Sequence, residues 1–97
     1  MFEWNEDKRL TTIEKHGIDF YDAAEIFAKD YLRLEAASEL EKRSLAIGEL
    51  RGICIAVVFT MREDVTRIIT ARRARKNERE LYQAHVTRRD AENEKPN

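Results

Sequence analysis

The sequence contains only one cysteine, one proline and three glycines, and it has no long hydrophobic run. The single cysteine, Cys54, cannot form a disulfide within the chain, and its apolar neighbours indicate a small core residue rather than a nucleophile. The longest apolar stretch, residues 53–60, is too short to cross a bilayer. The first residues lack the apolar stretch of a signal peptide. We therefore expect a soluble, cytoplasmic protein that makes no contact with a membrane.

Several common catalytic devices are also absent from the sequence. The two histidines, His16 and His85, are far apart and no Cys/His cluster accompanies them, so a metal site has no support. The three glycines are isolated from one another, which excludes a glycine-rich phosphate loop. No motif that would expose a nucleophilic serine or cysteine on a sharp turn is present. We expect neither a metal nor a cofactor.

The charged residues are numerous and unevenly distributed along the chain. They make up 38% of the 97 residues, yet the net charge is only −1. Residues 1–61 carry 8 Lys or Arg against 12 Asp or Glu, whereas residues 62–97 carry 10 against 7. Such asymmetry can indicate a polyanionic or acidic partner. Equally, the two halves could neutralise each other on folding.

The hydrophobic pattern predicts one α+β domain over residues 1–89, followed by a polar, disordered tail at residues 90–97. Asn5 and Asp19 are typical helix N-caps, and Gly17 suits the left-handed residue that ends a helix. The predicted helices are residues 6–16, 19–28 and 76 to the high eighties. The predicted strands are residues 2–4, 31–35, 43–48, 53–60 and 65–71, with a turn at 36–42. Short turns between the later strands predict an antiparallel sheet of about four strands, one face of which is buried against helices.

A cluster of basic residues follows the last predicted strand. Five cations fall within eight residues, namely Arg72, Arg73, Arg75, Lys76 and Arg79. Arg67 lies on the strand that leads into them. Guanidinium groups at the junction of a strand and a helix can converge on phosphate oxygens. RNA cleavage by attack of the 2′-hydroxyl group needs the charge of the phosphorane stabilised, and arginines can do this without a metal.

The same reaction needs groups that move protons. Glu78 and Tyr82 lie one helical turn apart beside the basic cluster, and His16 could approach through the fold. A histidine at the end of a helix more often satisfies a backbone carbonyl, so we assign His16 a structural role. The alternative for the whole cluster is a solvated basic helix face whose charged pairs have no catalytic role.

Several segments follow one another in a pattern that covers most of the chain. The N-terminal segments are Phe2-Glu3-Trp4-Asn5 with Lys8, then Lys15-His16-Gly17-Ile18 with Phe20, Ala23-Ala24 and Phe27. The later segments are Arg43 with Ala46-Ile47-Gly48, Val57-Val58-Phe59-Thr60 with Arg62, and Arg67-Ile68-Ile69-Thr70-Ala71-Arg72 with Ala74, Glu78-Arg79 and Tyr82. Together they span residues 2–82, and in this order they resemble the BrnT family of type II toxins. Two departures are a short, proline-free stretch at residues 29–42 and Asn5 where Asp is commoner in the family.

The resemblance implies a RelE-like fold and a ribonuclease that cleaves RNA to inhibit translation. It implies a BrnA-like ribbon-helix-helix antitoxin as partner, with operator DNA bound only through the toxin–antitoxin complex. The implied catalytic group is Arg67, Arg72, Glu78, Arg79 and Tyr82. Arg73, Arg75 and Lys76 are then expected to contact RNA.

Two other functions are compatible with the sequence. The chain could be a non-catalytic module, an inactive toxin homologue that only binds nucleic acid or an antitoxin. It could also be a structural interaction domain whose arginines meet an acidic protein surface. A binder would shift RNA without shortening it, whereas an interaction domain would have no affinity for RNA at all.

Overall fold

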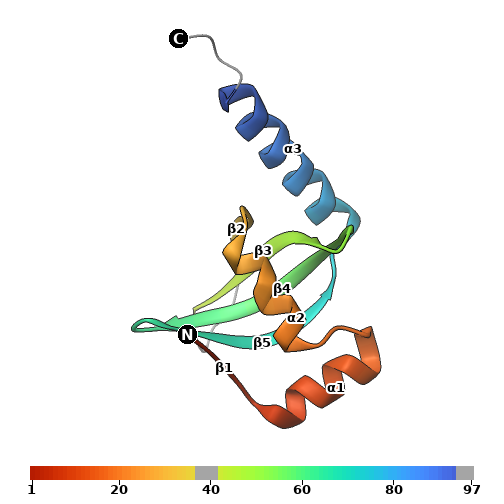
Figure 1. Cartoon of the computed structure of the whole chain (residues 1–97), viewed down its shortest axis with the longest axis vertical. Coiled ribbons are helices and arrows are strands. Elements are labelled where there is room, and N and C mark those ends of the chain that lie inside the picture. The colour runs from red at the N-terminus through yellow and green to blue at the C-terminus, as the bar shows by residue number, and fades with distance from the viewer. Residues whose placement is uncertain (37–41, 94–97) are drawn as a thin grey trace.

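The computed structural model describes residues 1–36 and 42–93, and its element order is strand, helices, four strands and a helix (Figure 1). The strands are β1 (Phe2–Trp4), β2 (Leu32–Ala36), β3 (Arg43–Leu50), β4 (Ile53–Arg62) and β5 (Val65–Arg73). The helices are α1 (Glu6–His16), α2 (Phe20–Ala23), the 3-10 helix η1 (Ala24–Ala28) and α3 (Lys76–Asn93). The expected α+β class is confirmed. Most of the turn predicted at 36–42 lies outside the described residues.

The strands form one sheet in the order β1-β5-β4-β3-β2. Strands β2 to β5 are antiparallel neighbours, as predicted. The expectation of about four antiparallel strands needs one correction, because β1 adds a fifth strand that runs parallel to β5. A parallel partner must come from a distant part of the chain, here across about 60 residues, and no local pattern announces it. A register shift near Val58 and Phe59 marks a bulge between β4 and β5.

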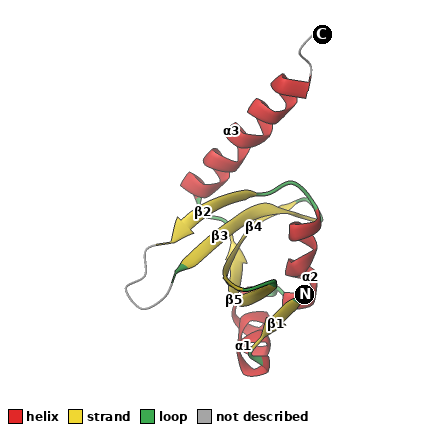
Figure 2. Ribbon diagram, turned by 90° about the vertical axis from the view of Figure 1, so that its left-hand side faces the viewer, coloured by secondary structure: helices red, strands yellow, loops and turns green. Residues whose placement is uncertain are grey.

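Helices cover both faces of the sheet, unequally (Figures 1 and 2). The N-terminal helices pack on one face, where α1 and α2 contact β5 and η1 contacts β3. Helix α3 touches β2 and β3 on the other side and rises away from the sheet. The predicted burial of one face holds for the N-terminal helices, and α3 adds a smaller contact on the opposite face through Tyr82. Helix α3 also continues to Asn93, four residues beyond the predicted domain boundary at residue 89.

The predicted caps are confirmed, and they explain where the N-terminal helices begin and end. The side chain of Asn5 accepts a hydrogen bond from the amide of Lys8, and Asp19 accepts one from the amide of Tyr21. Gly17 closes α1 with φ +69°, a left-handed conformation that glycine adopts without strain. The helix predicted at 19–28 is instead a short α-helix followed by a 3-10 helix. Its apolar face, including Phe20 and Ala23, is buried as expected.

The core lies mainly between the N-terminal helices and the sheet. Its fully buried large side chains include Phe20, Ile26, Ile55, Phe59 and Ile68. A smaller apolar cluster occupies the opposite face, where Tyr82 of α3 packs on buried residues of β3 and β4. Because side chains alternate along a strand, neighbouring residues of β5 belong to different faces, except at the bulge, which shifts the alternation by one residue.

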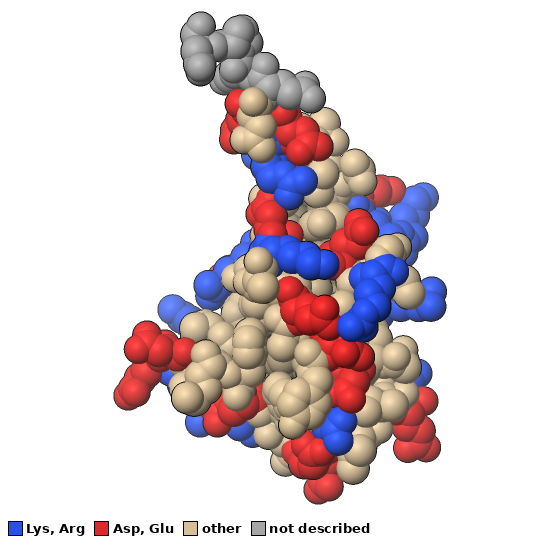
Figure 3. All heavy atoms as spheres, in the orientation of Figure 1, with Lys and Arg blue, Asp and Glu red and all other residues tan. Residues whose placement is uncertain are grey.

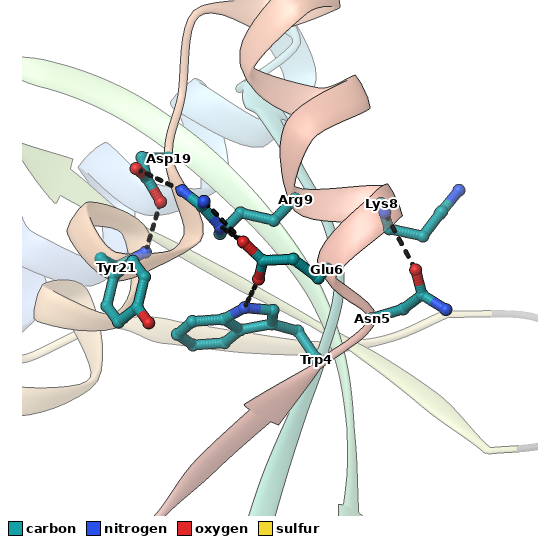
Figure 4. A network of polar contacts seen from close by, with 7 residues as sticks. All are labelled: Trp4, Asn5, Glu6, Lys8, Arg9, Asp19 and Tyr21. Carbon is teal, nitrogen blue, oxygen red and sulfur yellow. Dashed lines mark hydrogen bonds and ion pairs between the residues drawn. The ribbon is translucent and has the colours of Figure 1, made fainter.

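A polar network ties β1 to α1 and α2 (Figure 4). Arg9 donates hydrogen bonds to Glu6 at 2.7 Å and to Asp19 at 2.9 Å. The indole of Trp4 donates to Glu6 at 3.2 Å, and its ring packs edge-on against Tyr21. Trp4 also packs on the main core, as predicted from its position on the first strand.

Candidate functional site

The junction between β5 and α3 carries a tight pair of opposite charges, Arg72 and Glu78. The two guanidinium NH groups of Arg72 donate to the two carboxylate oxygens of Glu78, at 2.7 and 2.9 Å. Such a bidentate pair fixes the plane as well as the position of the guanidinium group. The side chain of Glu78 is only 6% exposed and that of Arg72 is 19% exposed. Arg72 is therefore held in one orientation with a small part of its surface open to solvent.

Glu78 also fixes the start of α3. Its carboxylate accepts a hydrogen bond from the backbone amide of Arg75 at 2.7 Å, as a glutamate in the first turn of a helix often does. The hydrogen bonds from Arg72, with that from the Arg75 amide, lower the pKa of Glu78 from 4.5 to about 2 despite its burial. Glu78 is thus ionised at neutral pH. One side chain couples the end of the last strand to the beginning of the last helix.

The other cations of the cluster are less constrained. Arg79 donates a hydrogen bond from one guanidinium nitrogen to the backbone carbonyl of Ala74 at 2.7 Å. Within the described residues, no hydrogen bond or ion pair involves the side chains of Arg73, Arg75 or Lys76, and all three are exposed. Because Glu78 is the sole acidic residue between positions 72 and 79, the junction carries excess positive charge. Figure 3 shows basic side chains gathered at the level where α3 leaves the sheet.

The structure separates the predicted site residues by face. Arg72 pairs with Ala56, and both belong to the face on which α3 packs. Arg73 pairs with Ile55 and therefore belongs to the face covered by the N-terminal helices. Strand alternation thus places two consecutive arginines on opposite sides of the sheet.

Arg67 lies on the same face as Arg72 but apart from it. Arg67 pairs with Thr60 of β4. It lies five residues before Arg72 along β5, which corresponds to about 15 Å of strand. Its guanidinium lies 3.7 Å from the carboxylate of Glu3, the residue that pairs with it on β1. The structure therefore brings Arg72, Glu78 and Arg79 together at the junction and leaves Arg67 beside β1.

Tyr82 lies one turn beyond Glu78, partly buried against Ile47 and Ala56. Burial, together with the nearby carboxylate of Glu49, raises the pKa of the Tyr82 hydroxyl group. Tyr82 therefore keeps its proton at neutral pH and is suited to donate it rather than to accept one.

A contact that the sequence did not reveal holds α3 beside the sheet. Asp30, which precedes β2, accepts from Arg89 at 2.7 Å and lies 3.2 Å from the ring of His85. The hydrogen bonds from Arg89 and His85 lower the pKa of Asp30. These residues are more than 50 positions apart, so no sequence spacing could have connected them.

The arginines at the junction are suited to bind an anion such as a phosphate group. Arginine forks suit phosphate oxygens, and a positioned guanidinium can stabilise negative charge that develops in a transition state. The described residues contain no group of three or more His, Cys, Asp or Glu that could hold a metal ion. None of the described helices is long and apolar enough to span a membrane.

A family model described as the ribonuclease toxin BrnT of type II toxin-antitoxin systems matches residues 4–78. The chain belongs to this family. The match covers most of the chain and confirms the resemblance seen in the sequence segments. No curated protein matches the chain. The BrnT match contains Arg67, Arg72 and Glu78 and ends before Arg79 and Tyr82. The catalytic roles of all five residues stay predictions.

Proposed function

We propose that this BrnT-family chain is a metal-independent endoribonuclease that cuts single-stranded RNA and thereby blocks translation. The observation that supports this most directly is the excess of exposed cations around an arginine held in place, Arg72, at the β5–α3 junction. Such an arrangement offers charge to a phosphate diester and does not depend on a bound ion. Family membership supports the general activity, and the positive charge at the junction supports the proposal that cleavage takes place there.

In the proposed reaction the 2′-hydroxyl group gives its proton to solvent water and its oxygen attacks the adjacent phosphorus. The bond from phosphorus to the 5′-oxygen then breaks. Arg72 and Arg79 stabilise the charge on the phosphate oxygens, and Arg67 binds RNA further along the same sheet face. Tyr82 donates a proton to the departing 5′-oxygen, a role that its protonated, partly buried hydroxyl group favours. Arg73, Arg75 and Lys76 contact neighbouring phosphates.

The geometry supports a positioning role for Glu78 rather than proton transfer. Its two oxygens already accept hydrogen bonds from Arg72 and from the amide of Arg75. A carboxylate with a pKa of about 2 is also a weak base at neutral pH. We therefore assign Glu78 to the orientation of Arg72.

The test is cleavage of an end-labelled single-stranded RNA by the purified chain in the presence of EDTA. We expect shortened products that end in a 2′,3′-cyclic phosphate, since that is the product of 2′-hydroxyl attack. Arg72→Ala should slow cleavage by about 100-fold or more. Arg88→Ala, which removes an exposed cation elsewhere on α3, is the matched control.

A second candidate, a non-catalytic module that binds RNA or an antitoxin, has one observation in its favour. Arg72 and Glu78 neutralise each other, which weakens the attraction of Arg72 for an anion. Binding of intact RNA with no shortened product at any enzyme concentration would establish this alternative. Complete loss of cleavage in EDTA that Mg²⁺ restores would refute metal independence alone.

We further propose a BrnA-like ribbon-helix-helix antitoxin as the partner that silences the toxin, with operator DNA bound through the complex. Expression of this chain alone should arrest growth, and co-expression of the gene beside it should restore growth. Arg72→Ala and Arg79→Ala should each relieve the arrest. Because Arg72→Ala also breaks the pair with Glu78, both variants are compared at a temperature at which circular dichroism shows them folded. Full toxicity of both variants would contradict the assigned roles.

A further inference from the structure

A cavity lies on the face of the sheet opposite Arg72. It has a volume of about 180 Å³ and lies between the end of α1, the β3–β4 turn and the end of β5. Its apolar walls are formed by Ile18, Leu50, Ile53 and Ile55. Ile18, Leu50 and Ile55 are buried, whereas Ile53 is 42% exposed and forms an open side. No step of the proposed cleavage reaction uses this cavity.

Arg73 supplies the cavity with a positive charge that no acidic side chain neutralises among the described residues. It pairs with Ile55 across β4 and β5, so its side chain leaves the sheet on the cavity side. Strand β1 pairs with β5 only as far as Ile68, so no strand of the described part of the chain pairs with this edge of β5 at its last residues. An RNA strand bound at Arg72 can therefore pass around this edge to Arg73.

The rim also carries a hydrogen-bond acceptor, the carboxylate of Asp22. Arg51 also lines the cavity. It forms an ion pair with Glu25 at 2.9 Å and a longer one with Asp22 at 3.6 Å. Asp22 is 46% exposed, so its oxygens are still accessible to a ligand. An ionised carboxylate only accepts hydrogen bonds, and it therefore selects ligands that carry N–H donors.

We propose that this cavity binds one nucleotide of the RNA substrate next to the scissile phosphate. The base lies between the aliphatic walls, its exocyclic amino group donates to Asp22, and its phosphate contacts Arg73. Enzymes that bind an unstacked base often hold it between apolar side chains in this way. The inference rests on the proposed ribonuclease function and adds a preference for adenine, cytosine or guanine over uracil. Uracil has no exocyclic amino group, and its one ring N–H lies between two carbonyl oxygens that a carboxylate repels.

The size of the cavity agrees with a single base. Pockets for drug-sized ligands have volumes of about 300–1,000 Å³, so this cavity is too small for a larger cofactor. An apolar side chain of a protein partner would also fit the walls. The rim favours a nucleotide, because Arg73 and Asp22 offer one charge for a phosphate and one acceptor for an amino group.

The binding test uses the full chain and the four 5′-mononucleotides AMP, CMP, GMP and UMP, followed by amide chemical shifts in NMR spectra. We expect the amides of Gly17 and Ile53 to shift, and UMP to bind most weakly. Arg73→Ala should weaken binding of all four nucleotides by about tenfold, the effect of losing one charge-assisted hydrogen bond. Arg88→Ala should leave binding unchanged.

A substitution at Asp22 tests the base preference. Asp22→Asn keeps the size of the side chain but adds a donor, so the advantage of AMP, CMP and GMP over UMP should disappear. Glu25→Gln is the matched control, because it removes the other carboxylate that pairs with Arg51, does not line the cavity and leaves Asp22 in place. Equal binding of all four nucleotides to the unaltered chain, or no effect of Arg73→Ala, would overturn the proposal.

Cleavage of RNAs that differ only in the base beside the cut separates this inference from the proposed function. Cleavage with no base preference, unchanged by Asp22→Asn, would leave the ribonuclease proposal intact and refute the pocket. Nucleotide binding at Gly17 and Ile53 without any RNA cleavage would support the pocket and refute the ribonuclease. If Arg73→Ala impairs only neutralisation by the antitoxin, the cavity belongs to a protein interface and the proposal is wrong.

Discussion

The Arg72–Glu78 pair should make a large contribution to the stability of the fold. Replacing Glu78 by Gln keeps the shape of the side chain but removes its charge and places an amide donor against a guanidinium donor. The pKa of Glu78 is 4.5 in an ordinary environment and about 2 in the folded chain. A difference of this size corresponds to about 3 kcal/mol of unfolding free energy at neutral pH. Breaking a buried charge pair costs about 3–5 kcal/mol, which agrees.

The sign of the pH dependence follows from the lowered pKa. Because the folded state holds Glu78 ionised more strongly than the unfolded state does, its contribution is fully present above about pH 4.5 and is lost as the pH falls to about 2. The unfolding free energies of the unaltered chain and of Glu78→Gln should therefore differ by about 3 kcal/mol at pH 7 and converge in strong acid. At neutral pH the variant should melt at least about 10 °C lower.

Urea unfolding followed by the fluorescence of Trp4, the single tryptophan, measures this difference at each pH. Trp4 packs partly on the core, so its emission reports the folded state. A double-mutant cycle with Arg72→Ala isolates the coupling between the two side chains. A difference below about 1 kcal/mol at pH 7, or one that stays constant down to pH 2, would refute the assigned role of Glu78.

Two further predictions concern other contacts. Gly48→Ala should lower the unfolding free energy by about 1–3 kcal/mol, because the added Cβ would lie 3.1 Å from the Cβ of buried Ile26. Urea titration measures this change, and an unchanged midpoint would contradict the tight packing of η1 on β3. Asp30→Asn should speed hydrogen exchange of the α3 amides beyond His85, and it should leave the amides of β4 protected, because only the contact between α3 and the sheet is weakened. Acid should likewise lower the protection of these amides in the unaltered chain, because Asp30, whose pKa is lowered, then becomes protonated. Equal protection in the unaltered chain and in the variant would show that the contact is dispensable.

Local signals predicted the antiparallel part of the fold well. The apolar, β-branched run at residues 53–60 is the central part of β4, and Asn5, Gly17 and Asp19 cap the helices where expected. Within α1, however, Leu10 is 53% exposed while Thr12 is buried. Apolar residues on a short helix do not all turn inward, because the sheet beneath α1 offers a limited surface.

Contacts between segments that are far apart in the sequence could not be predicted from sequence patterns. The parallel pairing of β1 with β5 and the contact of Asp30 with α3 join residues that no periodicity relates. The basic cluster was visible in the sequence, yet its division by the sheet into Arg72 on one face and Arg73 on the other depends on register. The hydrogen bond from the Arg75 amide to Glu78 could have been predicted, because a glutamate in the first turn of a helix often accepts a backbone hydrogen bond.

The position of β1 has a consequence for how the molecule is made. Among the described strands this one is synthesised first, and its neighbour in the sheet is β5, which is synthesised last. Since strands joined over long sequence distances form slowly, the N-terminal segment must wait for residues 65–73 before it is in place. The described sheet therefore closes only after those residues have left the ribosome.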